Sequence, residues 1–200
     1  VHCENVACTS VTATPIDTTG DVGDFNSIII DRRGLGIVSY YDATNRDLKF
    51  AACLDIACTT ATLRTLDSAN DVGSHTSLAL HNNGFPLIAY GDDTNGNLKL
   101  AICDDTCATP NLVTIDASAN DVGNRNALTA LDDFVVVAHH DATAGALKLT
   151  RCRTNATVCN AVSSVTADAT ATSGEGIAIA RMANLVPVIF YTRNFEVRAI

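Results

Sequence analysis

The sequence predicts an all-β protein: a β-propeller of four blades, each with four strands and about 50 residues. Three observations predict it: a repeat that fills the chain, hydrophobic residues that alternate with period two, and the absence of a sustained amphipathic helical pattern. Asp-Val-Gly recurs every 50 residues at 21–23, 71–73 and 121–123, and 174–176 is a degenerate fourth copy, Gly-Glu-Gly. We therefore expect one domain over residues 1–200, built from units at approximately 1–53, 54–103, 104–152 and 153–200.

Within each unit, short β-rich runs are separated by turns rich in Gly, Asn and Asp, which tolerate tight backbone geometry. In the second unit the strands are expected at Thr62–Leu66, Ser77–His81, Pro86–Tyr90 and Leu98–Cys103. Four antiparallel strands repeated radially are typical of propeller blades. The end of the chain is in phase with its beginning, which fits a closed circle of four blades, part of a longer array, or two chains that complete a larger ring.

The composition excludes several classes of protein. Of the 200 residues, 47% are hydrophobic and 18% are charged, and mean hydropathy is +0.17, so the chain has enough apolar residues to fold. The net charge of −9 argues against nucleic acid and anionic membranes as partners. The most apolar stretch, 177–191, contains Arg181, Asn184 and Pro187, so no membrane insertion is expected.

The cysteines occur as four local pairs in register with the repeat. Each pair follows the last expected strand of one blade and precedes the first strand of the next, which indicates one disulfide per blade connection. Zinc binding is the competing interpretation, but zinc sites usually have a tighter, two-residue spacing. The pairs are Cys3 with Cys8, Cys53 with Cys58, Cys103 with Cys107, and Cys152 with Cys159. Because disulfides persist outside the cytosol, we expect an extracellular or cell-surface protein, with Asn155 as the candidate glycosylation site.

The second conserved block of the unit is Ser39-Tyr40-Tyr41-Asp42-Ala43-Thr44-Asn45-x-Asp47-Leu48-Lys49. It resembles repeats of secreted bacterial proteins with predicted β-propeller domains, which are loosely similar to the Asp-box repeats of sialidase-like propellers. The chain has no Trp and no Ser-x-Asp-x-Gly-x-x-Trp pattern, so it departs from a true Asp box. The resemblance implies a propeller fold and secretion, and it identifies no activity.

Two turns of each blade are expected to project from one face, which makes that face acidic. Oxygen-rich turns of this kind are candidates for Ca²⁺, although Asp is also favoured in turns for local hydrogen bonding alone. The candidate metal ligands are Asp21, Asp42, Asp47, Asp71, Asp92, Asp121 and Asp141, and Asp93 and Glu175 lie on the same face.

One position of the repeat is aromatic or imidazole in all four units, at Tyr40, Tyr90, His139 and Tyr191. These side chains are either a ring that stacks on a sugar or another ligand, or a shared core position. The sequence favours neither interpretation.

No catalytic constellation stands out. The arginines do not recur at one repeat position, and no nucleophile elbow, phosphate loop or His-Glu-x-x-His motif is present. We therefore expect an extracellular, non-enzymatic structural or interaction module that requires no cofactor. Its expected partners are copies of itself, with which it forms a surface or filamentous assembly, or other extracellular proteins or glycans. The alternative is a carbohydrate-binding propeller, followed by a sialidase-like glycoside hydrolase.

Overall fold

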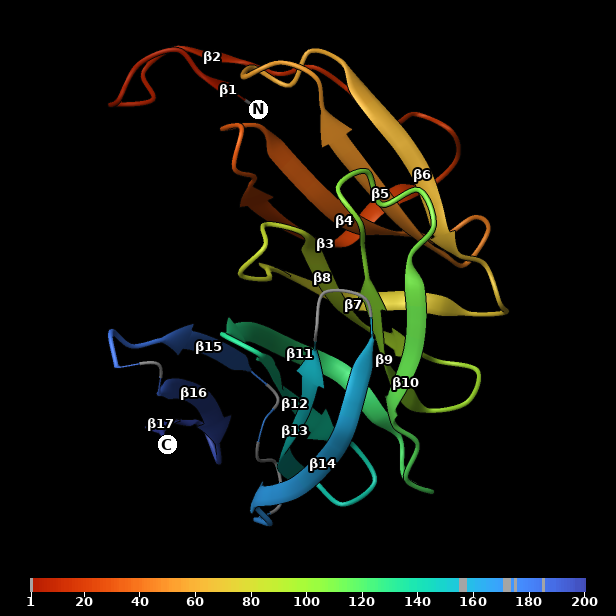
Figure 1. The fold of residues 1–200 in the computed structure, drawn as a ribbon, viewed down its shortest axis with the longest axis vertical. Helices are drawn as coiled ribbons and strands as arrows, with labels where there is room; N and C mark the ends of the chain where they lie inside the picture. Colours follow the sequence, from red (N-terminus) through yellow and green to blue (C-terminus); the bar gives the residue numbers. More distant parts are fainter. Residues whose placement is uncertain (1, 155–157, 171–173, 175, 185) are drawn as a thin grey trace.

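The structure is a computed structural model that describes residues 2–154, 158–170, 174, 176–184 and 186–200 (Figure 1). Its regular elements are all β-strands, which confirms the predicted fold class. Within these residues, no helix has the length and apolar character needed to cross a membrane.

A short N-terminal hairpin precedes four larger antiparallel sheets, which we number 1 to 4. Sheets 1, 2 and 3 have four strands each in chain order, and sheet 4 has three. The hairpin pairs β1 (His2–Cys3) with β2 (Val11–Thr12). Sheet 1 contains β3 (Val22–Ile30), β4 (Gly36–Asp42), β5 (Asp47–Cys53) and β6 (Ala61–Asp67), and sheet 2 contains β7 (Val72–Leu80), β8 (Pro86–Asp92), β9 (Asn97–Ile102) and β10 (Asn111–Asp116). Sheet 3 contains β11 (Val122–Leu131), β12 (Phe134–Asp141), β13 (Ala146–Thr154) and β14 (Cys159–Asp168), and sheet 4 contains β15 (Ile177–Arg181), β16 (Pro187–Arg193) and β17 (Glu196–Ala199).

The grouping of strands into sheets differs from the expected units by one strand. The strand expected to begin each unit after the first is the last strand of the preceding sheet. The strand expected to open the second blade is β6, which instead closes sheet 1 by pairing with β5, with Cys53 opposite Ala61. The physical reason is the short loop between them, which reverses the chain and makes its two flanking strands antiparallel neighbours. Among the described residues, sheet 4 has three strands, so the expectation of four strands in every blade does not hold there.

All four expected disulfides are present, and they join Cys3 to Cys8, Cys53 to Cys58, Cys103 to Cys107 and Cys152 to Cys159. The expectation that these disulfides lie at the connections between blades is wrong. Each one closes the loop between the third and fourth strands of the same sheet, or the equivalent β1–β2 hairpin. The disulfides therefore fix hairpins within sheets.

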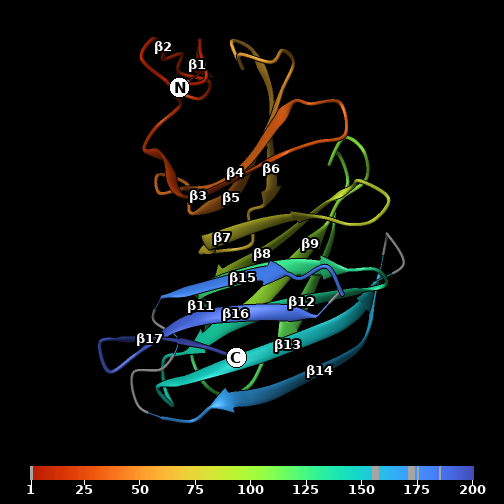
Figure 2. The same cartoon turned by 90° about the vertical axis from the view of Figure 1, so that its left-hand side faces the viewer.

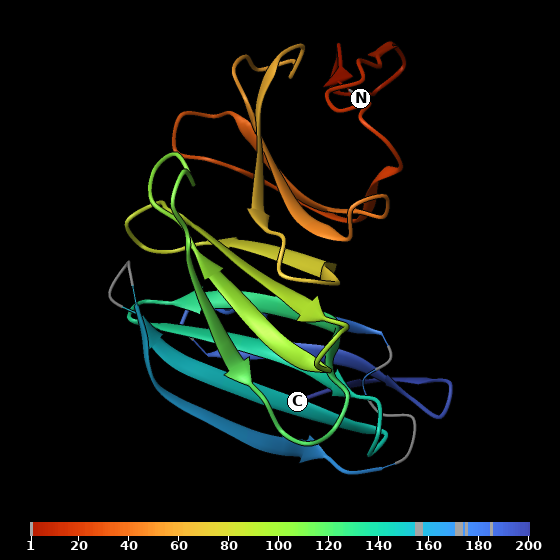
Figure 3. The same cartoon turned by 90° about the vertical axis from the view of Figure 1, so that its right-hand side faces the viewer.

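Apolar side chains fill the spaces between successive sheets. One cluster joins Phe50 of sheet 1 to Leu78 of sheet 2, a second joins Leu100 of sheet 2 to Leu128 of sheet 3, and a third joins sheet 3 to Ile189 of sheet 4. The first strands of successive sheets, β3, β7, β11 and β15, lie next to one another along the arc. The described sheets form an open arc, with sheet 1 at one end and sheet 4 at the other (Figures 1 and 3). Figure 2 shows the strands of sheet 4 in front of those of sheet 3.

A glycine in the first strand lets successive sheets approach closely. Gly73 has φ +101°, and a Cβ added there would lie 2.6 Å from the Leu48 Cα of the preceding sheet. Gly123 has φ +95°, and a Cβ added there would lie 2.9 Å from the Leu98 Cα. Since a side chain would collide with this backbone, the repeat requires glycine at the position.

Candidate functional site

The four aromatic or imidazole residues lie on the second strand of each sheet and are buried. Tyr40, Tyr90, His139 and Tyr191 are between 0% and 6% exposed. Side chains so enclosed have no free ring face for a sugar. This burial favours the alternative interpretation, a shared core position, and the stacking ring for ligands stays a prediction.

Each of the three tyrosines donates a hydrogen bond to an aspartate 23 residues earlier in the chain. Tyr90 donates to Asp67 at 2.7 Å, and this aspartate belongs to the last strand of the preceding sheet. Tyr40 donates to Asp17 at 2.7 Å, and Tyr191 donates to Asp168 at 2.9 Å. Burial, followed by the aspartate beside it, raises the pKa of the Tyr90 phenol far above its usual range. The hydroxyls are therefore fixed donors.

A cation completes each of these contacts, and for Tyr40 and Tyr90 this cation is a lysine on the next strand. Lys99 lies opposite Tyr90 in the sheet, and its Nζ is 2.5 Å from the Asp67 carboxylate. Burial acts to raise the pKa of Asp67, but hydrogen bonds from Lys99 and Tyr90 outweigh it, so the pKa is lowered. Asp67 is therefore a buried carboxylate that stays charged because two donors from the next sheet hold it.

We call each set of aspartate, aromatic or imidazole residue, and cation an inter-sheet clasp. Three clasps share one spacing, and in the fourth Arg193 approaches Asp168 at 3.6 Å while Arg198, which lies opposite Tyr191, pairs with Glu196. The clasps are Asp17–Tyr40–Lys49, Asp67–Tyr90–Lys99, Asp116–His139–Lys148 and Asp168–Tyr191–Arg193. The sequence analysis missed the aspartates, although their constant distance from the aromatic position is a signal that could have identified them.

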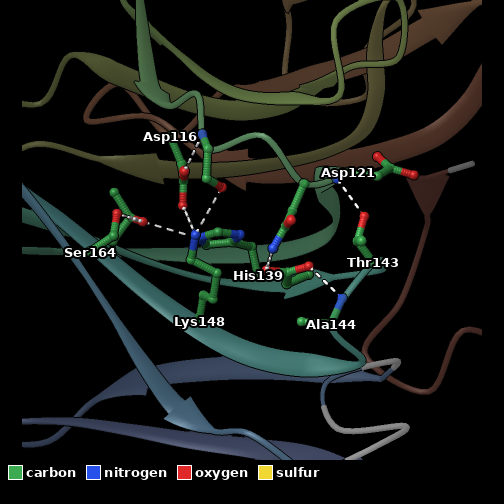
Figure 4. Close-up of polar contacts among 11 residues, drawn as sticks. Asp116, Asp121, His139, Thr143, Ala144, Lys148 and Ser164 are labelled. Carbon is green, nitrogen blue, oxygen red and sulfur yellow. Dashed lines mark hydrogen bonds and ion pairs between the residues drawn. The ribbon is translucent and has the colours of Figure 1, made fainter.

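The third clasp has histidine in place of tyrosine (Figure 4). His139 Nε2 lies 2.9 Å from Thr150 Oγ1 and 3.6 Å from Asp116 Oδ2, while Lys148 Nζ contacts the same Asp116 oxygen at 2.5 Å. Burial lowers the pKa of His139 to about 4, and the nearby Asp116 only partly opposes this effect. The imidazole is therefore neutral at pH 7, and Lys148 is the cation of this clasp.

The His139 cluster does not have the geometry of a hydrolytic triad. Thr150 and Asp116 both approach the same ring nitrogen, Nε2, whereas in a triad the nucleophile and the acid bind opposite nitrogens. The Nδ1 atom is buried without a hydrogen-bond partner among the described residues. Ser164 continues the contacts outward by hydrogen bonding to Thr150 at 2.6 Å. The hydrogen bond with Thr150 and the contact with Asp116 fix the orientation of the His139 ring.

The two acidic turns lie together in the first three repeats, as expected from sequence. The Asp71 carbonyl accepts a hydrogen bond from the Asp93 N–H at 2.9 Å, and its own N–H donates to Thr94. Asp21 and Asp121 make the same pair of contacts with residues 43–44 and 142–143. Figure 4 shows the bond from the Asp121 N–H to Thr143. These bonds join the start of each sheet to its second hairpin.

The carboxylates of most candidate metal ligands accept hydrogen bonds from nearby residues. Asp42 and Asp92 each accept bonds from the N–H and the side-chain amide of the asparagine three residues later, and Asp141 accepts from the Ala144 N–H. Asp71 accepts from the Tyr41 hydroxyl at 2.7 Å, and Asp121 accepts from Asn124. Burial, followed by the nearby Asp42, raises the pKa of Asp47.

Within the described ranges, no three His, Cys, Asp or Glu side chains lie close enough to hold a metal. Calcium binding at the acidic turns stays a prediction. Asn155 and Glu175 lie outside the described residues, so the structure does not bear on the glycosylation site.

The fold is similar to that of GH43 domains, which are five-bladed β-propellers. A bifunctional GH43-CE protein from Bacteroides eggerthii matches with a TM-score of 0.53 and 10% identity, over 83% of this chain and 22% of that one. A GH43 β-1,3-galactosidase matches with a TM-score of 0.55 and 12% identity, over 83% of this chain and 38% of that one. No protein-family model and no curated protein matches the sequence. At this identity the likeness shows the fold alone.

Proposed function

We propose that this chain is an extracellular, non-enzymatic structural and interaction module whose stacked sheets form a rigid scaffold. The observation that most supports the proposal is the use of the repeated polar residues. Asp67, Tyr90 and Lys99, the kinds of side chain that could do chemistry, bind one another across a sheet boundary and are buried. An aspartate of one sheet paired with a cation of the next recurs at each of the three junctions, as expected for a structural device.

The disulfides support the proposed extracellular compartment. Four disulfides close hairpins along the chain, and such bonds persist in oxidising environments. An extracellular scaffold gains from them because short cross-linked hairpins resist local opening and proteolysis.

Glycoside hydrolysis is the activity that the fold likeness makes worth testing. Glycosidases usually place two carboxylates on either side of an open cleft. Here the clasp carboxylates of Asp67 and Asp116 are buried and ion-paired with Lys99 and Lys148. Asp42, Asp92 and Asp141 are buried in their turns. These positions favour a scaffold over a catalytic centre.

The test is an assay of the oxidised chain on aryl galactosides, arabinosides, xylosides and sialosides, together with a glycan-binding array, each with Ca²⁺ and with EDTA. We expect no turnover above that of the same protein after reduction and heating. Turnover by the folded protein alone would overturn the proposal in favour of a glycosidase. Binding to a defined glycan would overturn it in favour of the carbohydrate-binding alternative.

A further inference from the structure

Successive sheets contact each other through one repeated set of residues. Gly73 and Gly123 pack on Leu48 and Leu98 of the preceding sheet, and each of these leucines is fully buried. Beside them the Val72 N–H donates to the carbonyl of residue 46 at 3.1 Å, and the Val122 N–H donates to that of residue 96 at 3.0 Å. The third junction repeats the contact between Gly174 and Leu147. One face of each sheet is therefore built to receive the next sheet.

Sheet 4 presents this receiving face to solvent. Val197 occupies the position of Leu48 and Leu98, yet it is 75% exposed. Phe190, in the place of the fully buried Ala89, is 49% exposed. The strand that carries Val197, β17, is an edge strand, whereas its equivalents in sheets 1 to 3 are each paired with a fourth strand. The last sheet thus lacks both its neighbour and its fourth strand among the described residues.

Sheet 1 presents the complementary face. Gly23 has φ +109°, like its equivalents, but nothing lies within 4 Å of a Cβ added there. Ile28 is 63% exposed, whereas its equivalents Leu78 and Leu128 are each 7% exposed. Two grooves of about 280 and 320 Å³ lie between this face and the N-terminal segment, and Val38 lines both. This face has the shape and polarity of one that docks on a preceding sheet.

The N-terminal segment corresponds in the repeat to the fourth strand of a sheet. Asp17 forms a clasp with Tyr40, as Asp67 does with Tyr90, so residues 11–17 correspond to residues 61–67. Residues 61–67 form β6, which is both the fourth strand of its own sheet and the clasp to the next one. Residues 11–17 make the clasp, but only Val11 and Thr12 are paired, with β1.

We infer that sheet 4 of one chain binds sheet 1 of a second copy, with residues 11–17 of the second copy added as a fourth strand along β17. The inference rests on the proposed function, for which it names the partner. The interface continues a junction that the chain already makes three times, with Gly23 of the second copy on Val197 and Ile28 on the face that carries Phe190. A second copy fits because the two faces of one chain lie at opposite ends of the arc and carry the two halves of the repeated junction (Figures 1 and 3). Such a head-to-tail contact produces a ring or a filament.

The test measures the mass of the oxidised chain by light scattering during size exclusion, over a series of protein concentrations. We expect a mass of at least twice 20.9 kDa at high concentration. Val197→Asp and Ile28→Asp each remove one face and should reduce the mass to that of one chain. Leu54→Asp, at a 61% exposed position in the Cys53–Cys58 loop, is the matched control and should keep the wild-type mass.

A mixture of the two interface variants distinguishes binding between two chains from contact between the two faces of a single chain. Val197→Asp keeps an intact sheet 1 face and Ile28→Asp keeps an intact sheet 4 face, so an equimolar mixture should contain a species of two chains and none larger. Three results would each overturn the inference. The wild-type chain could stay monomeric, or the mixture could stay monomeric. The third is that the single variants keep the wild-type mass while circular dichroism shows them folded. Phe190→Ser, which copies Ser39 of sheet 1, provides a second variant if Val197→Asp does not fold. Turnover of a glycoside would overturn the proposed function without changing these masses.

Discussion

The hydroxyl of Tyr90 in sheet 2 donates a 2.7 Å hydrogen bond to Asp67 in sheet 1, and both side chains are buried. Lys99 contacts the same carboxylate, so a charged group at the sheet boundary is held by two donors from the neighbouring sheet. Removing one partner of such a buried group leaves its charge poorly compensated. The clasps should therefore make a measurable contribution to the stability of the sheet junctions.

Tyr90→Phe should lower the free energy of unfolding by about 1.5–3 kcal/mol, since the lost hydrogen bond is made to a buried ionised group. Urea denaturation followed by circular dichroism measures the change. Tyr41→Phe is the matched control, because the Tyr41 hydroxyl also donates to an aspartate at 2.7 Å but at a partly exposed site where water can replace it. Equal losses in the two variants would contradict a special role for the buried clasp.

His139→Tyr should make the protein less sensitive to acid. The pKa of His139 is about 4 in the folded protein and near 6.5 in an unfolded chain, so protonation favours unfolding. The stability that depends on the neutral imidazole is complete above about pH 6.5 and is lost as the pH falls towards 4, by up to about 3 kcal/mol. Tyrosine stays neutral throughout and can donate to Asp116 as in the other clasps.

The measurement is the difference in Tm between pH 7 and pH 4.5 for the wild type and for His139→Tyr. We expect a smaller difference for the variant. His75, whose pKa is lowered by burial, is present in both proteins, so its contribution cancels in the comparison. Identical pH dependence in the two proteins would show that His139 does not titrate in this range.

The sequence predicted the strands and the disulfide pairs because both depend on local patterns. The alternation of Leu98 and Leu100 with polar neighbours in β9, for example, needs no knowledge of the rest of the fold. The grouping of strands into sheets was missed because the Cys53–Cys58 loop can equally join two blades or two strands of one sheet. The role of Tyr90 was missed for a similar reason: its partner, Asp67, is on another sheet, and only the arrangement of sheets brings the two together.

Removing the disulfide between Cys103 and Cys107 should cost more stability than removing the one between Cys3 and Cys8. The two loops differ by one residue, so the entropy of closure is nearly the same, about 2 kcal/mol in each case. Cys103 and Cys107 are buried in the core between sheets, whereas Cys3 and Cys8 are exposed. Replacing both buried cysteines by alanine therefore also creates a cavity, which should add about 1–2 kcal/mol. Equal midpoints in urea for the two double-alanine variants would contradict this account.

Gly73→Ala and Gly23→Ala separate backbone strain from packing between sheets. Both glycines have positive φ, so alanine at either position carries a similar strain of about 1–2 kcal/mol. Only at Gly73 does the added methyl collide with the neighbouring backbone, 2.6 Å from the Leu48 Cα, whereas the space at Gly23 is open. In a monomeric background such as Ile28→Asp, Gly73→Ala should therefore lower the free energy of unfolding by at least about 2 kcal/mol more than Gly23→Ala, because overpacking adds to the strain.

The same Gly23→Ala substitution in the otherwise wild-type chain tests the contact between copies. There the methyl should meet Val197 of a second chain, so the variant should reduce the assembled mass in light scattering even though it costs the monomer little beyond strain. The reason is that the Gly73–Leu48 contact within the chain and the proposed Gly23–Val197 contact between chains have the same geometry, and both require a glycine. Full assembly of Gly23→Ala would mean that sheet 1 meets its partner differently from the way sheet 2 meets sheet 1.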